Sequence, residues 1–235
     1  MNLFRKRRDE NYNHLEVIER PSSFTTESIH KLIINLEYAN VDKKYKAIQI
    51  TSSLSSEGKT TLIGNMAVLL AQRNHKVIII DLDLRKPKVN RLFGASNDVG
   101  ITNYLHGSAS LEEVIKNGNH GVDLIVAGER TSAVVNLLES EKLTELIAIL
   151  KEKYDYILLD TPPVQVNADA MMVSRITDGV VYVIGYNIVK KNIIRDAVES
   201  LRRTEIPIIG VVLTQVKYSR RSGDYYHYYY YYGDN

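Results

Sequence analysis

The chain has 235 residues, of which 44% are hydrophobic, and its formal net charge is +2. It contains no Cys, which excludes a disulfide framework, a thiolate nucleophile and a cysteine-ligated metal site. No run of residues approaches the roughly 18 to 20 apolar positions that a membrane-spanning helix needs, so the composition indicates one α/β domain with polar tails.

The hydrophobic pattern alternates between helices and strands along the chain. Apolar residues at helical spacing predict a helix over residues 26–39, and a buried strand over 47–51 is followed by a helix over 60–73. Further strands are expected at 77–81, 122–127, 156–160, 180–185 and 208–213, and further helices near 88–93, 111–117, 139–152, 168–176 and 190–203. This order predicts an α/β fold in which helices flank both faces of a mostly parallel sheet.

A Ser-rich loop joins the strand at 47–51 to the helix at 60–73, and it matches the end of the phosphate-binding pattern G-x4-G-K-[ST]. Ser53 stands in place of the first Gly. Such a loop is also an ordinary helix cap, but its place between a strand and a helix favours a nucleotide site. The expected ATP-binding residues are Ser55, Ser56, Glu57, Gly58, Lys59, Thr60 and Thr61.

Two more strands are expected to end in carboxylates. Asp81 and Asp83 follow one apolar run, and Asp160 ends another. Because the carboxyl ends of parallel strands meet at one edge of a sheet, we expect these groups beside the loop, where they can bind Mg²⁺ or accept a proton. Acidic residues also end strands as plain turn formers, but two such motifs next to Gly58-Lys59-Thr60 favour a P-loop NTPase with Walker A, A' and B motifs.

Together, the three motifs resemble those of the bacterial tyrosine kinases (BY-kinases) of capsule and exopolysaccharide loci. That family carries a loop ending Gly-Lys-[Ser/Thr], an apolar run ending Asp-x-Asp-x-Arg, and another ending Asp-[Thr/Ser]-Pro-Pro; here they are residues 58–60, 81–85 and 160–163. The likeness extends over about residues 25–235. It implies a non-specific protein-tyrosine kinase that uses ATP and Mg²⁺, autophosphorylates between chains, and regulates capsule or exopolysaccharide synthesis and export.

The resemblance also implies a role for each matching residue. Lys59, Asp81 and Asp83 would be catalytic, with Asp81 as the candidate base for the tyrosine hydroxyl. Thr60, Asp83 and Asp160 would hold the metal. The phosphate acceptors would be the tyrosines of the C-terminal run, Tyr225, Tyr226, Tyr228, Tyr229, Tyr230, Tyr231 and Tyr232.

Partners and location follow from the same resemblance. They are a transmembrane modulator subunit, other copies of this chain, and a cognate tyrosine phosphatase, with the chain cytoplasmic and recruited to the inner face of the membrane through the modulator. No nucleic acid is expected, because neither basic cluster, residues 5–8 or 220–221, is interleaved with aromatic residues. The cluster at 5–8 is either a solvated tail or a contact with anionic lipid headgroups.

The sequence departs from the family at several positions. Ser55-Ser56 stands where family members often have Pro-Gly, and Thr214 replaces an Asn expected near the nucleotide base. The family's assembly motif Glu-x-x-Arg-x-x-Arg carries His30 and Ile33 in place of both arginines, which leaves a ring-shaped oligomer open. The expected domain organisation is a flexible basic segment at 1–24, a P-loop kinase domain at 25–217, and a flexible Tyr-rich tail at 218–235.

Two other functions stay open from the sequence. One is a nucleotide-switch ATPase of the septum-placement or partition type, whose loop has a signature Lys where this chain has Leu54. The other is a non-catalytic ATP-binding adaptor that presents its tail to another kinase. The kinase prediction is favoured because groups suited to phosphoryl transfer, a Lys, a Thr and three Asp, stand in the three motifs.

Overall fold

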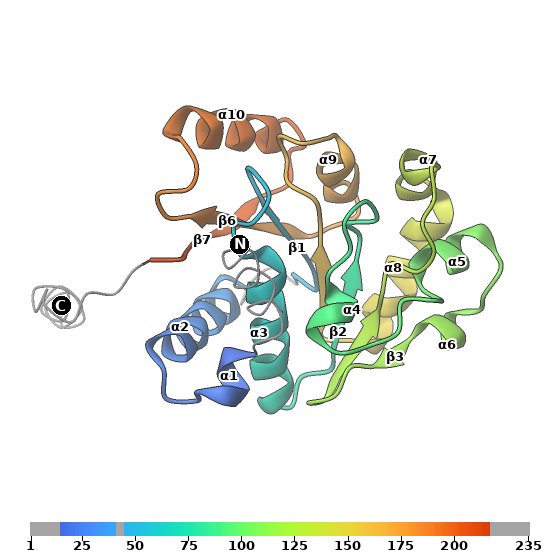
Figure 1. Cartoon of the computed structure of the whole chain (residues 1–235), viewed down its shortest axis with the longest axis horizontal. Helices are drawn as coiled ribbons and strands as arrows, with labels where there is room; N and C mark the ends of the chain where they lie inside the picture. The colour runs from blue at the N-terminus through green and yellow to red at the C-terminus, as the bar shows by residue number, and fades with distance from the viewer. Residues whose placement is uncertain (1–14, 41–44, 217–235) are drawn as a thin grey trace, which may run out of the picture.

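The computed structural model describes residues 15–40 and 45–216, and within them a seven-stranded sheet forms the centre (Figure 1). Its order is β3-β4-β2-β5-β1-β6-β7. Neighbouring strands pair in parallel, except that β3 runs antiparallel to β4. The strands are β1 (Ala47–Ser52), β2 (Val77–Asp81), β3 (Lys116–Asn117), β4 (Val122–Ile125), β5 (Tyr156–Asp160), β6 (Gly179–Gly185) and β7 (Ile208–Thr214).

Helices cover both faces of this sheet (Figure 1). One face packs against α1 (Glu16–Glu19), α2 (Phe24–Ala39), α3 (Lys59–Gln72) and α4 (Val89–Leu92). The other packs against α5 (Ile101–His106), α6 (Leu111–Val114), α7 (Val134–Leu138), α8 (Glu141–Lys153), α9 (Asp169–Ser174) and α10 (Lys191–Arg202). The predicted α/β fold is therefore confirmed. Across the described residues, we find no helix with the length and apolar character to cross a membrane.

The central strands β2, β5 and β1 are buried along their whole length. Their side chains are mostly apolar because a parallel sheet is covered on both faces, and the polar Gln49 and Thr51 of β1 are buried with hydrogen-bond partners. These three strands are adjacent in the sheet. Their carboxyl ends, each of which carries a polar motif, are consequently brought to one edge.

Some predicted boundaries were wrong for local reasons. α2 begins at Phe24, two residues early, because Ser23 caps it by accepting a hydrogen bond from the Thr26 N–H at 3.2 Å. The helix expected at 111–117 ends at Val114, since 116–117 pair with β4. The short helices α5 and α7 were not predicted, because each has too few turns to show a periodic pattern.

The N-terminal segment 1–24 was expected to be flexible, but its described part packs on the domain. Leu15 and Val17 are buried, and the Val17 N–H donates to Asn65 Oδ1 at 3.0 Å. Helix α1 therefore covers α3 rather than extending into solvent. Residues 1–14 and the Tyr-rich tail at 218–235 lie outside the described residues.

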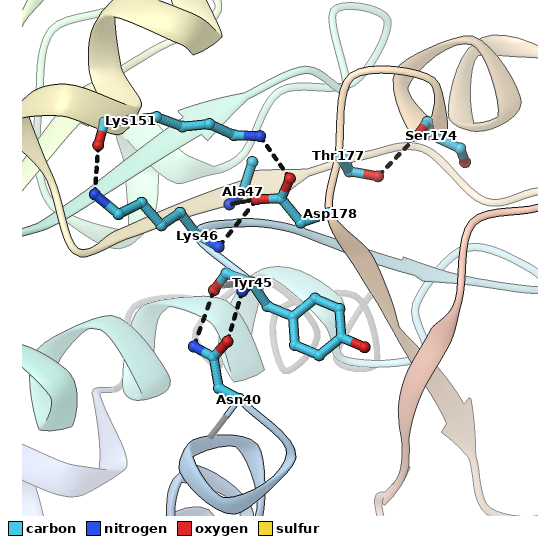
Figure 2. Close-up of polar contacts among 8 residues, drawn as sticks. All are labelled: Asn40, Tyr45, Lys46, Ala47, Lys151, Ser174, Thr177 and Asp178. Carbon is cyan, nitrogen blue, oxygen red and sulfur yellow. Dashed lines mark hydrogen bonds and ion pairs between the residues drawn. The ribbon is translucent and has the colours of Figure 1, made fainter. Parts of the chain in front are cut away.

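A polar network holds the amino end of β1, opposite the phosphate loop (Figure 2). Asp178 Oδ2 accepts hydrogen bonds from the Lys46 N–H at 3.0 Å and the Ala47 N–H at 2.8 Å, and Lys151 Nζ lies 2.5 Å from Asp178 Oδ1. These contacts join the starts of β1 and β6 to the end of α8. They fix the position of β1 before it enters the site.

Gly100, at the start of α5, is closely packed against the segment that follows β4. A Cβ added there would lie 2.2 Å from the Val126 oxygen and 2.5 Å from the Gly128 nitrogen, both backbone atoms. Gly100→Ala is therefore expected to lower the free energy of unfolding by about 2 to 3 kcal/mol, measured by urea denaturation. Gly210→Ala is the control, because its added Cβ would meet nothing within 4 Å. Equal stability of the two variants would contradict this packing.

Candidate active site

The candidate site lies where β1, β5 and β2 end. Asp81 and Asp160 occupy paired register positions on β2 and β5, and β1 runs directly into the Ser-rich loop before α3. The structure thus brings together the three motifs that were read from distant parts of the sequence. The loop residues Ser55 and Ser56 are exposed, as is Thr61 in the first turn of α3.

Lys59 is the first residue of α3 and is 93% buried, with 7% of its surface exposed. Its Nζ donates to Ser52 Oγ at 3.0 Å, which folds the side chain back over the loop. Burial lowers the pKa of the Lys59 ammonium, while the nearby charges of Asp160 and Asp83 raise it. Gly58 precedes it with φ at +88°, a left-handed conformation that suits Gly and starts the helix with its amides facing the site.

Thr60 and Asp160 form a pair suited to a hard cation. The Thr60 hydroxyl donates to Asp160 Oδ2 at 2.7 Å, while Asp160 Oδ1 is buried and lacks a hydrogen-bond partner among the described residues. Burial raises the pKa of Asp160 to about 6, against the opposing effect of the Lys59 charge. Because Mg²⁺ prefers oxygen ligands and takes one or two carboxylates together with phosphates, this orphaned oxygen fits the expected metal.

Asp81 is fully buried, and its carboxylate organises its own loop. Oδ2 accepts hydrogen bonds from the Lys88 N–H at 2.9 Å and the Val89 N–H at 3.0 Å, and Oδ1 accepts one from the Asp83 N–H at 3.2 Å. Burial, followed by the Asp160 charge, raises the pKa of Asp81. For Asp81 to act as the expected base, the segment that covers it must open when substrate binds.

Asp83 is less enclosed than Asp81, because it is only partly buried. Its Oδ1 accepts a hydrogen bond from the Lys86 N–H at 3.1 Å, and burial raises its pKa against the effect of that bond and of the Lys59 charge. Arg85, from the same motif, forms an ion pair with the buried Asp169 at 2.7 Å. This ion pair ties the loop after β2 to the start of α9.

Glu57 was expected to contact ATP, but its buried carboxylate is used within the protein. Oε1 accepts a hydrogen bond from the Leu54 N–H at 2.6 Å, and Oε2 accepts one from the Gly185 N–H at 2.8 Å. Its side chain therefore shapes the loop, which leaves the backbone as the part of this residue able to face a phosphate.

Several residues around the loop carry no sequence signal for this role. Tyr182 is fully buried on β6 and lies 2.6 Å from Ser53 Oγ through its hydroxyl, and burial raises its pKa to about 12. Thr214 and Gln215 contact the loop from the end of β7. They lie more than 100 residues from the loop in sequence, so only the folded chain reveals the contacts.

A loop of this geometry at the start of a helix, with a Lys, a Thr and strand-ending carboxylates at one sheet edge, defines a P-loop nucleotide-binding protein. Consistent with that class, the family model of the AAA domain matches residues 45–189. The chain is 34% identical over 203 residues to the tyrosine-protein kinase YwqD of Bacillus subtilis, with 86% of each chain covered. It belongs to the bacterial tyrosine-protein kinases of capsule and exopolysaccharide loci.

Solved structures of this family have the same fold. The chimerical protein CapA2B2 matches with a TM-score of 0.84 and 29% identity, covering 87% of this chain and 90% of that one. The kinase domain of the Escherichia coli tyrosine kinase ETK matches with a TM-score of 0.85 and 26% identity, covering 88% and 82%. The predicted resemblance is therefore confirmed.

A more distant structure shares the nucleotide-binding architecture. The septum site-determining protein MinD of Pyrococcus horikoshii, solved with Mg-ADP, matches with a TM-score of 0.64 and 27% identity. The match covers 75% of this chain and 72% of that one. The P-loop fold was thus predicted correctly.

Proposed function

We propose that this chain is an ATP-dependent protein-tyrosine kinase that phosphorylates the C-terminal Tyr cluster of a neighbouring copy and regulates capsule or exopolysaccharide synthesis and export. The observation that carries the proposal is the pairing of Thr60 with Asp160, beside the buried Lys59, in a member of the tyrosine-kinase family. These groups supply a cation and a metal position at the end of a phosphate loop.

In the proposed reaction, Lys59 and the amides of residues 55–61 bind the phosphates of ATP. Thr60, Asp83 and Asp160 would hold Mg²⁺, which when bound would supply neutralisation of phosphate charge. The tyrosine oxygen attacks the γ-phosphorus, and a new oxygen–phosphorus bond forms as the bond to the β–γ bridging oxygen breaks. Asp81 accepts the phenolic proton, and ADP leaves. Positioning and charge supply the rate, as in other phosphoryl transfers.

The proposed acceptors are the seven tail tyrosines from Tyr225 to Tyr232, which lie outside the described residues. Each phosphotyrosine adds about −1.5 to −2 charges near neutral pH. Because the site itself carries the carboxylates Asp81, Asp83 and Asp160, a modified tail is repelled by it and an unmodified tail is not. In this proposal, phosphorylation of the tail therefore promotes its release from the site.

The proposed partners are a transmembrane modulator subunit, further copies of this chain and a cognate tyrosine phosphatase. The modulator would recruit the chain to the inner face of the membrane. The alternative, a nucleotide-switch ATPase, is supported by the likeness to MinD but requires no tyrosine acceptor. An ATP-binding adaptor would need no base for a tyrosine hydroxyl, so the presence of Asp81 in register with Asp160 favours an enzyme.

The test is transphosphorylation between distinguishable copies. Purified full-length protein is incubated with ATP and Mg²⁺ and with Lys59→Met protein as the acceptor, with and without a cognate modulator segment, and phosphate is mapped by mass spectrometry. We expect phosphotyrosine between residues 225 and 232 of the Lys59→Met chain. Steady ATP hydrolysis without any phosphotyrosine, even with the modulator segment, would favour the nucleotide switch.

A further inference from the structure

The end of β7 forms a backing for the phosphate loop. Thr214 Oγ1 donates a hydrogen bond to the Glu57 carbonyl at 2.6 Å, and Gln215 Nε2 donates one to the Ser56 carbonyl at 2.7 Å. A Cβ added to Gly58 would lie 3.4 Å from the Thr214 side chain, so the loop and the strand end are in close contact. Two successive carbonyls of the loop are therefore held from the same side.

The end of β7 that makes these contacts is itself hydrogen-bonded to the end of β6. Thr214 is paired with Gly185 in the sheet, and its carbonyl accepts a hydrogen bond from the Tyr186 N–H at 2.9 Å. Gly185 in turn donates its N–H to the Glu57 carboxylate, which completes a second attachment of the loop to the ends of β6 and β7. The ends of β6 and β7 thereby make three hydrogen bonds to Ser56 and Glu57 of the loop.

The loop needs such support because its backbone is strained. Ser56 has φ at +67° and Gln215 has φ at +59°, a left-handed conformation that non-glycine residues adopt at a cost of about 1 to 2 kcal/mol. Ser56 stands where the family pattern often has Gly, so the strain belongs to this chain. A hydrogen bond between these two residues opposes relaxation of the loop to an ordinary conformation.

The geometry also fixes where the loop amides point. In a planar trans peptide the C=O and the N–H lie on opposite sides. Holding the Ser56 carbonyl towards β7 turns the Glu57 N–H away from β7, and holding the Glu57 carbonyl does the same for the Gly58 N–H. These amides are then directed to the side where a phosphate binds at the start of α3.

We propose that Thr214 and Gln215 are positioning residues for nucleotide binding, which set the direction of two phosphate-loop amides by holding the carbonyls of the same peptides. The proposal rests on the nucleotide-binding part of the proposed function and not on the acceptor tail. It gives Thr214 a role distinct from recognition of the nucleotide base, because its hydroxyl is already directed to the loop.

The test measures the Kd for Mg-ADP by titration calorimetry on the full chain, together with the thermal midpoint without nucleotide. Thr214→Val removes the hydroxyl at almost constant volume and leaves the Glu57 carbonyl without this donor, and we expect roughly a ten-fold weaker Kd. Thr214→Ser keeps the donor and should restore the Kd to within about two-fold. Gln215→Ala, at an exposed position, should weaken binding roughly three-fold with little change in the thermal midpoint.

An unchanged Kd in both Thr214→Val and Gln215→Ala would overturn the proposal, as would a wild-type protein that binds no Mg-ADP. Loss of thermal stability in Thr214→Val without loss of affinity would assign Thr214 a purely structural role. If wild-type protein binds Mg-ADP but phosphorylates no tyrosine, the kinase proposal fails. The Kd values of the variants still test the positioning role of Thr214 and Gln215. The KM for ATP should rise in step with the Kd while kcat changes less.

Discussion

Lys59→Met is expected to lower the initial rate of tyrosine phosphorylation by about 100- to 1,000-fold, because it removes the cation proposed to bind the phosphates of ATP. The folded state should tolerate the change. Lys59 is 93% buried and burial lowers its pKa, so the wild-type ammonium is held in an unfavourable environment that an apolar Met of similar length relieves. The rate is measured with ATP and Mg²⁺ by phosphotyrosine detection, and the fold by thermal midpoint.

Lys76→Met provides the matched control, since Lys76 is exposed just before β2, at the opposite end of that strand from Asp81. It should leave the rate within about two-fold of wild type, as expected for a surface substitution. A rate for Lys59→Met within ten-fold of wild type would contradict the role given to Lys59. A large drop in the thermal midpoint would instead show that the ammonium stabilises the loop through Ser52.

Asp160→Asn is expected to cost about 100-fold or more in the same rate, because a neutral amide replaces the carboxylate proposed to hold Mg²⁺. In the absence of metal the substitution should stabilise the protein. Asp160 Oδ1 is buried without a partner among the described residues, and the pKa of Asp160 is raised to about 6. The folded state therefore disfavours the charged form of Asp160, and the neutral Asn side chain avoids this cost.

The direction of the pH effect follows from that shift. An Asp in the unfolded chain titrates near pH 3.9, whereas folded Asp160 titrates near pH 6. The unfolded state thus releases this proton first, so the contribution of Asp160 to the stability of the metal-free protein falls as the pH rises from about 4 to 6, and the fall is complete above that range. The advantage of Asp160→Asn should accordingly grow from pH 4.5 to pH 7.5 in urea denaturation with a chelator present.

Asp155→Asn is the control for this measurement, because Asp155 is exposed at the opposite end of β5. Its Oδ2 accepts a hydrogen bond from the Lys76 N–H at 2.8 Å. It should show no such pH-dependent gain. If Asp160→Asn proves less stable than wild type at pH 7.5 without metal, the buried carboxylate contributes to the fold and the argument for a metal position weakens. Unchanged activity would exclude Asp160 from the metal site.

Prediction from sequence succeeded where a short segment carries its own information. The strands β1, β2 and β5 were located from short, mainly apolar runs, and the glycine and the residues around Lys59 identified the loop without reference to the rest of the chain. The strand-ending positions of Asp81 and Asp160 followed from the same runs. Because parallel strands must end at one edge of the sheet, their meeting with the loop was also predictable.

Prediction failed where a feature depends on contacts between distant segments. Helix α1 lies in a polar stretch without helical periodicity, and its position depends on the burial of Leu15 and Val17 against another helix. The two-residue strand β3 exists only because β4 offers it a partner. Neither contact leaves a periodic pattern in the residues themselves.

The sequence by itself determined the fold class, the family and the identity of the phosphate loop, because these depend on hydrophobic period and on motifs of fewer than ten residues. Only the tertiary structure decided which partners each polar group has. Asp81 and Glu57 are both candidate site residues in sequence, yet folding buries them on backbone amides. Thr214 lies 157 positions from Glu57 in the sequence. Their contact is revealed only by the fold, in which the sheet brings β7 beside β6.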